Sequence, residues 1–73
     1  MDNIIVKDFP AISLAAARVN AKLTQKGLAE ACGVSESTVI AWESGRRQPT
    51  VGKLKLIEQA VGLSLNFIDF GRH

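Results

Sequence analysis

The stretch "GVSESTVIAWESG", from Gly33 to Gly45, decides how this chain folds. Gly33 is expected to end one helix, because glycine adopts the left-handed conformation at a helix C-terminus at little cost. Ser35 is expected to cap the start of the next helix, since its hydroxyl accepts a hydrogen bond from the free backbone N–H groups there. Gly45 closes that second helix. The stretch therefore predicts a tight turn followed by one short helix.

The residues before the turn predict a helix of their own. Thr24 is a suitable N-cap for it. The inward-facing residues of this helix are Leu28, Ala29 and Cys32, and those of the helix after the turn are Val39, Trp42 and Glu43. Ala29 is small enough for the two helices to cross closely. A helix pair joined by "GVS" at this spacing is the strongest structural signal in the chain.

Weaker signals on both sides complete an all-α fold. They favour a short strand or arm over residues 2–9, and helices over about 12–21, 51–61 and 64–70. We therefore expect a compact domain of five short helices around one core. The expected organisation is an arm over 1–11, a domain over 12–70 with its helix pair at about 24–44, and a tail over 71–73.

Composition limits the classes of function. The 73 residues make one small domain, and 9 Lys and Arg against 7 Asp and Glu leave a net charge of +2. Nucleic-acid binding is compatible with this charge only if the cations cluster locally. The chain has one cysteine, Cys32, which favours a small buried hydrophobe over a redox sensor.

Catalysis and metal binding are not expected from this sequence. The lone histidine is His73, and no Ser/His, Cys/His or paired-carboxylate arrangement is visible. We therefore predict a non-enzyme with no metal, no cofactor and no small-molecule substrate. No secretory signal or stretch of membrane-spanning length is seen, which favours a cytoplasmic location without a membrane partner.

The stretch "LTQKGLAEACGVSESTVIAWESGRRQPTVGKLKLIEQAVGLSL" resembles the lambda-repressor/Cro-type helix-turn-helix family, and the resemblance extends over about residues 12–68. It implies a regulator that binds double-stranded DNA and reads the major groove with the helix at 35–44. It further implies a homodimer, and a place in a phage or mobile-element switch.

The resemblance assigns backbone contacts to residues around the helix pair. In this family the glutamine at the start of the second helix, here Gln25, contacts a phosphate and braces the reading helix. The residues implied as phosphate contacts are Gln25, Lys26, Lys22, Arg46, Arg47, Gln48 and Lys53. The alternative is that these are solvated polar residues at a helix start and in a basic loop.

The resemblance also implies a structural ion pair. In this family an arginine of the first helix pairs with the acid that follows the tryptophan, and Arg18 and Glu43 hold these positions. A buried bidentate pair would orient the reading helix. We expect loss of one partner to cost about 3–5 kcal/mol, because the other charge is left buried alone.

The reading face departs from the pattern of a base reader. Its residues are Ser35, Glu36, Ser37, Ile40 and Ala41, with none of the Arg, Lys, Asn or Gln that usually contact base edges. Two interpretations stay open. The face reads DNA through Glu36 and through apolar contacts to thymine methyl groups, or it contacts a partner protein.

A second departure concerns apolar residues in the C-terminal half. Leu56 and Phe67 stand where the family tends to be polar, and Phe70 extends that surface, so the three are expected to form a partner or dimer surface. The alternative is that the N-terminal arm folds back and covers them.

Two functions therefore follow. The first is a sequence-specific DNA-binding regulator. The second is an anti-repressor that binds a partner repressor and masks the surface with which that repressor reads DNA.

Overall fold

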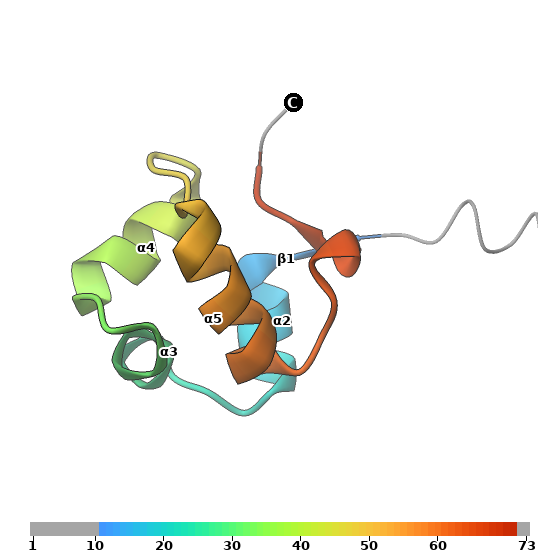
Figure 1. Ribbon diagram of the computed structural model, residues 1–73, viewed down its shortest axis with the longest axis horizontal. Coiled ribbons are helices and arrows are strands. Elements are labelled where there is room, and N and C mark those ends of the chain that lie inside the picture. The colour runs from blue at the N-terminus through green and yellow to red at the C-terminus, as the bar shows by residue number, and fades with distance from the viewer. Residues whose placement is uncertain (1–10, 72–73) are drawn as a thin grey trace, which may run out of the picture.

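A computed structural model describes residues 11–71 of the chain (Figure 1). In this part the chain forms α2 (Leu14–Asn20), α3 (Gln25–Cys32), α4 (Glu36–Ser44) and α5 (Val51–Val61). A short strand, β1 (Ile12–Ser13), precedes them, and a 3₁₀ turn, η1 (Leu65–Phe67), leads into the strand β2 (Ile68–Asp69). Residues 1–10 of the expected arm and residues 72–73 of the expected tail lie outside the described residues.

The predicted helix signals are confirmed for the three central helices. Thr24 Oγ1 accepts a hydrogen bond from Gly27 N at 2.8 Å, and Ser35 Oγ accepts one from Thr38 N at 3.2 Å. Thr50 caps α5 in the same way. Gly33 ends α3 in the left-handed conformation with φ 69°. These local contacts explain why α3, α4 and α5 begin and end where the sequence predicts.

The expected first helix is shorter than predicted. It was expected over about 12–21 but begins at Leu14, because Ser13 caps it and accepts a hydrogen bond from Ala16 N at 3.0 Å. Ile12 and Ser13 are held in an extended conformation by pairing with another segment.

The expected fifth helix is wrong. Only Leu65–Phe67 coil, as a single 3₁₀ turn, and Ile68–Asp69 are extended. Ser64 accepts from Asn66 N and the Glu58 carboxylate accepts from Leu65 N, so these side chains satisfy the start of a turn. β-branched Ile68 then fits an extended segment better than a helix.

The two short strands close the domain. They pair in parallel, with Ile12 opposite Ile68 and Ser13 opposite Asp69. The C-terminal segment therefore returns beside the start of the first helix, as Figure 1 shows next to the β1 label. Ile68 is 6% exposed and belongs to the core, so burial of its side chain stabilises the pairing of the two strands.

One core joins all these elements. α3 packs against both α4 and α5, and α2 closes the far side. Each helix contributes at least one of the largest fully buried side chains, which are Leu14, Leu28, Cys32, Val39 and Ile57. Burial confirms the inward stripe predicted for α3, and that of α4 at Val39 and Trp42, while Glu43 is only partly buried. The packing leaves one side of α4 in solvent, and that side carries the candidate site.

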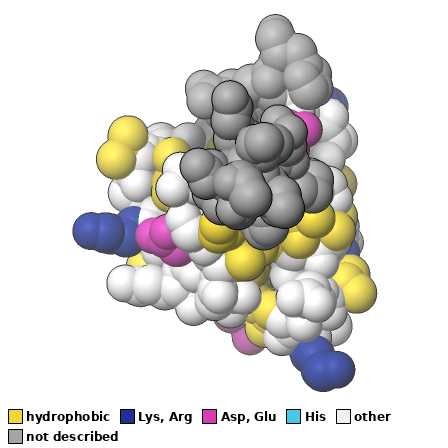
Figure 2. Space-filling model, turned by 90° about the vertical axis from the view of Figure 1, so that its right-hand side faces the viewer, with side chains coloured by type: hydrophobic (Ala, Val, Ile, Leu, Met, Phe, Trp, Pro, Cys, Tyr) yellow, Lys and Arg dark blue, Asp and Glu magenta, His cyan; other side chains and the backbone are white. Residues whose placement is uncertain are grey.

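Figure 2 shows the side of the molecule on which the C-terminal segment lies, away from α3 and α4. Hydrophobic side chains gather near its centre, and Lys and Arg side chains stand only at its margins. The described residues on this face therefore do not form the cation cluster that a nucleic-acid backbone requires.

Candidate nucleic-acid interface

The solvent-facing side of α4 is narrow and weakly charged. Glu36, Ser37 and Ile40 are exposed, and Ile40 is among the few large apolar side chains on the described surface, with 40% of its area exposed. Glu36 lies in the first turn of α4, where an acidic side chain interacts favourably with the helix dipole. This side of the helix thus presents one acid, serine hydroxyls and one branched apolar group.

The placement of Ala41 on this face is wrong. Ala41 is only 4% exposed, so its methyl group is not available to a base. In an α-helix, residues four positions apart lie close together around the axis, so the helical period alone would place Ala41 beside exposed Ser37, and its burial comes from the packing of α4. Its carbonyl oxygen serves instead as an acceptor for the loop after α4, as described below.

Ser35 has a mainly structural role at the start of α4. Its hydroxyl caps the helix and lies 3.0 Å from both the Ser37 Oγ and the Thr38 Oγ1 atoms. These contacts hold the hydroxyl of Ser35 within the first turn. Ser37 and Glu36 are therefore better placed than Ser35 to contact another molecule.

A three-residue network orients α4. Arg18 Nε donates to Glu43 Oε2 at 2.6 Å, with exposures of 14% and 9% for the two side chains. A second guanidinium nitrogen of Arg18, Nη1, donates to the Leu23 carbonyl at 2.8 Å. Gln25 Nε2 donates to the other Glu43 oxygen at 2.9 Å. The expected ion pair is thus present, but it is not bidentate, because only Nε of Arg18 reaches Glu43. Gln25 takes the second carboxylate oxygen, which places its amide against the reading helix.

The bond between Gln25 and Glu43 has a geometric consequence. Gln25 is the first residue of α3, and Glu43 lies near the end of α4, so these two helix ends meet. Lys26 follows Gln25 directly, and the loop with Arg46 and Arg47 follows α4. Lys26 and the loop arginines, which are far apart in sequence, therefore adjoin the two helix ends that this bond brings together.

The expected phosphate contacts fall into an exposed group and an engaged group. Lys22, Lys26, Arg46 and Arg47 have exposed side chains. Arg46 Nε donates to Ser44 Oγ at 3.2 Å, which holds its stem beside the end of α4. Lys22 has φ 62°, a left-handed conformation that costs a non-glycine residue about 1–2 kcal/mol.

Lys53 is placed differently from the expectation. Its ammonium group donates to the Cys32 carbonyl at 2.9 Å, so it caps the C-terminus of α3 instead of projecting freely toward a phosphate. Burial raises the pKa of the Cys32 thiol, and the nearby Lys53 ammonium partly opposes this rise. The thiol therefore stays neutral at physiological pH, as befits a buried apolar group.

Gln48 is also engaged within the protein. Its side-chain Nε2 donates to the Phe70 carbonyl oxygen at 3.3 Å. This contact links the loop after α4 with the C-terminal segment. Sequence reasoning missed it, because only the pairing of the strands brings Phe70 to this loop.

The expected apolar partner surface is wrong for two of its three residues. Leu56 and Phe70 are partly buried and pack against the core, so they do not form an exposed patch. Phe67 is half-buried in the 3₁₀ turn. The large apolar side chains that are exposed lie elsewhere, at Ile12, Val19, Ile40 and Val51. The alternative cover by the arm lies outside the described residues.

Residues 11–71 also bear on metal binding and on membrane insertion. No group of three or more His, Cys, Asp or Glu side chains there is placed to hold a metal ion. None of the helices in this part of the chain has both the length and the apolar character needed to cross a membrane.

Comparison with known proteins agrees with the architecture. A family model described as helix-turn-helix matches residues 14–68. This range starts with α2 and ends at the first residue of β2, so it includes every helix described above. No curated protein and no solved structure matches the chain.

Proposed function

The chain belongs to the Cro/C1-type helix-turn-helix family of DNA-binding transcriptional regulators, and from this premise we propose that it reads a specific DNA sequence with α4. The observation that carries the proposal is the hydrogen bond between Gln25 and Glu43. It joins the start of α3, next to Lys26, to the end of α4, next to Arg46 and Arg47, and so supports a role for these exposed cations in one shared contact with DNA.

The cations position the protein on DNA in this proposal. Lys22, Lys26, Arg46 and Arg47 contact phosphates and release counterions, which makes binding depend steeply on salt. Gln25 braces α4 through Glu43 and presents its amide near the positive N-terminus of α3, a position suited to an anion. Contacts of this kind set orientation and carry no sequence information.

Sequence specificity comes from the exposed side of α4. Ile40 fits the methyl group of thymine, and Glu36 accepts a hydrogen bond from a cytosine amino group. Ser37 contacts a base edge as donor or acceptor. A homodimer would place two such helices in successive major grooves roughly 34 Å apart. A role in a phage or mobile-element switch stays a prediction from the resemblance.

A second candidate function is supported by the same exposed side. Glu36 and Ile40 offer an acid and an apolar group, which also suits contact with the basic reading surface of a partner repressor. The net charge of +2 is low for a protein held mainly by phosphates. This anti-repressor hypothesis predicts a protein complex in place of a DNA complex.

The first test selects binding sequences from a random DNA pool and measures affinity across a salt series. A specific complex is expected, with affinity falling linearly on a logarithmic scale as salt rises. Arg47→Ala should flatten the salt dependence by about one phosphate contact. Lys22→Asn is a matched variant, because asparagine tolerates the left-handed conformation better than lysine. A loss of affinity there reflects the charge and not the fold.

Glu36→Gln separates the two functions. Removing this negative charge should strengthen DNA binding or change the selected sequence, because the carboxylate is repelled by nearby phosphates. If α4 instead presses its acid on a basic partner, the same change should weaken that protein complex. Electrophoretic mobility shift with the selected DNA, with and without a repressor encoded nearby, gives the comparison. Absence of any specific DNA complex would refute the first function.

A further inference from the structure

We propose that the C-terminal segment 68–71, called here the strap, positions the loop at residues 46–49 for DNA binding, with Phe70 as its main positioning residue. The inference rests on the proposed function in one respect, that Arg46 and Arg47 of this loop contact the DNA backbone. It adds a role for a segment that touches no DNA itself.

The loop is fixed at its start by one carbonyl oxygen. The backbone N–H groups of Arg46 and Arg47 both donate to the Ala41 carbonyl, at 3.0 and 3.3 Å. Beyond these bonds, residues 46–50 form no helix or strand. The two arginine side chains are exposed, and the bond from Arg46 Nε to Ser44 Oγ supports only the first of them.

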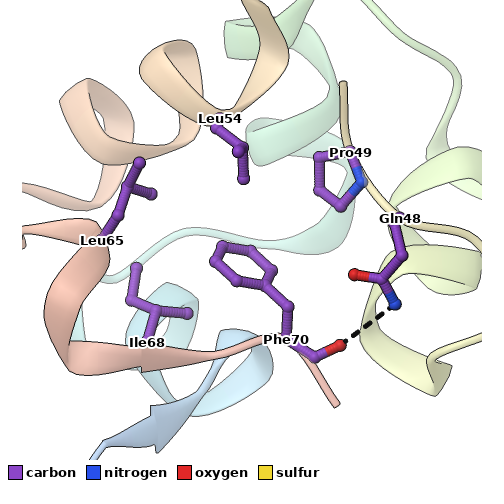
Figure 3. Close-up of a pocket in the computed structure, with 6 residues that line it drawn as sticks. All are labelled: Gln48, Pro49, Leu54, Leu65, Ile68 and Phe70. Carbon is purple, nitrogen blue, oxygen red and sulfur yellow. Dashed lines mark hydrogen bonds between the residues drawn. The ribbon is translucent and has the colours of Figure 1, made fainter. Parts of the chain in front are cut away.

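The strap supports the other half of the loop. Gln48 Nε2 donates to the Phe70 carbonyl at 3.3 Å, and the ring of Phe70 points into a hollow of about 240 Å³ (Figure 3). The hollow is also lined by Pro49 of the loop and by Leu54 of α5. One residue of the strap thus meets the loop with both its backbone and its side chain.

The strap also runs beside the end of α4. A methyl group built on Gly71 would lie 3.9 Å from the Cα atom of Gly45, the residue that ends the reading helix. A second hollow of about 200 Å³ is lined by residues of both segments, among them Gly45, Phe70 and Gly71. The strap therefore borders the loop at both of its ends.

The strap itself is firmly attached. Asp69 pairs with Ser13, Ile68 pairs with Ile12, and Ile68 is 6% exposed. A segment anchored in the core at one end and bonded to the loop at the other limits the movement of that loop. Because ordering long side chains opposes binding, a loop held in place before contact binds DNA more tightly.

The test measures the loop first without DNA. Phe70→Ala should speed amide hydrogen exchange at Arg46 and Arg47, whose N–H groups are bonded to Ala41 in the intact protein. Val61→Ala is the control, because it truncates a core side chain at the opposite end of α5, about 15 Å from the loop. It should lower overall stability without selective exchange at the loop. Unchanged exchange in Phe70→Ala would overturn the proposal.

The second measurement is a double-mutant cycle in which DNA-binding affinity is compared between variants. Phe70→Ala should weaken binding roughly tenfold in the otherwise unchanged protein. In the Arg46→Ala/Arg47→Ala background it should have little further effect, because the loop then has no arginine to position. An equal loss in both backgrounds means a general structural role and overturns the proposal.

A second variant and the arginine variant allow the proposed role of the strap to be tested separately from folding and from phosphate contact. Gln48→Met removes the bond to Phe70 but keeps the bulk of the side chain, and should speed loop exchange in the same direction if Phe70→Ala fails to fold. If the arginine variant binds DNA as well as the unchanged protein, the phosphate role in the proposed function fails. The exchange measurement, made without DNA, then decides by itself whether the strap holds the loop.

Discussion

Glu43 shows how a charge is made acceptable in a nearly buried position. Both of its oxygens accept hydrogen bonds, one from Arg18 and one from Gln25, and its side chain is 9% exposed. Arg18 in turn donates to a backbone carbonyl. A charge removed from water is tolerable only while its partners remain, so each member depends on the others.

Arg18→Ala should therefore lower the free energy of unfolding by about 3 kcal/mol, because it leaves the Glu43 carboxylate without its counter-charge. Urea denaturation followed by circular dichroism gives the value. The matched variant is Arg18→Met with Glu43→Leu, which removes both charges and should recover part of the loss. An Arg18→Ala protein as stable as the original would contradict the role assigned to the pair.

At the scale of the element, the helix ends are set by local chemistry. Each of the four helices starts at a serine or threonine whose side chain accepts a backbone N–H, and three of them end at a glycine with positive φ. These signals act within a few residues, which is why the bounds of α5 at Val51–Val61 match the prediction from sequence.

Gly52 within α5 and Gly62 at its C-cap allow the contribution of backbone conformation to stability to be measured directly. Neither Gly52 nor Gly62 has an atom within 4 Å of an added methyl group, but only Gly62 has a left-handed backbone, with φ 68°. Gly52→Ala should stabilise the protein by about 0.5–1 kcal/mol, because alanine favours the helix. Gly62→Ala should destabilise it by about 1 kcal/mol. Thermal unfolding of both variants tests the prediction, and equal shifts would refute it.

At the scale of the whole molecule, the domain is closed by contact between its two ends. The pairing of β1 with β2 joins residues 56 positions apart, from Ile12 to Ile68. This closure replaces the expected fifth helix, and it carries Phe70 to the loop after α4. A two-residue ladder has few hydrogen bonds, so burial of Ile68 is its main support.

The two isoleucines of this ladder should therefore differ in their effects. Ile68→Ala is expected to lower the free energy of unfolding by about 2–4 kcal/mol, since the side chain is 6% exposed. Ile12→Ala, at the paired position with 37% exposure, should cost about 1 kcal/mol or less. Denaturant titration of both variants makes the comparison. Similar losses would mean that hydrogen bonding, and not burial, holds the strap.

The sequence by itself determined the helix pair and the turn between them. Gly33, Ser35 and Gly45 act on their own backbone, and the stripes of α3 and α4 follow the helical period, so a local pattern suffices. It also predicted the ion pair of Arg18 and Glu43 through the family resemblance. Membership of the helix-turn-helix family agrees with that reading of the central stretch.

Only the tertiary structure decided what lies around the pair. Partners distant in sequence decide the direction of the Lys53 and Gln48 side chains. They also decide the burial of Leu56 and Phe70 and the extended conformation of the C-terminal segment. Ala41 is buried because α4 sits at one particular rotation against its neighbours. Local propensity cannot set such contacts, because their free energy arises when the core forms and not within the segment itself.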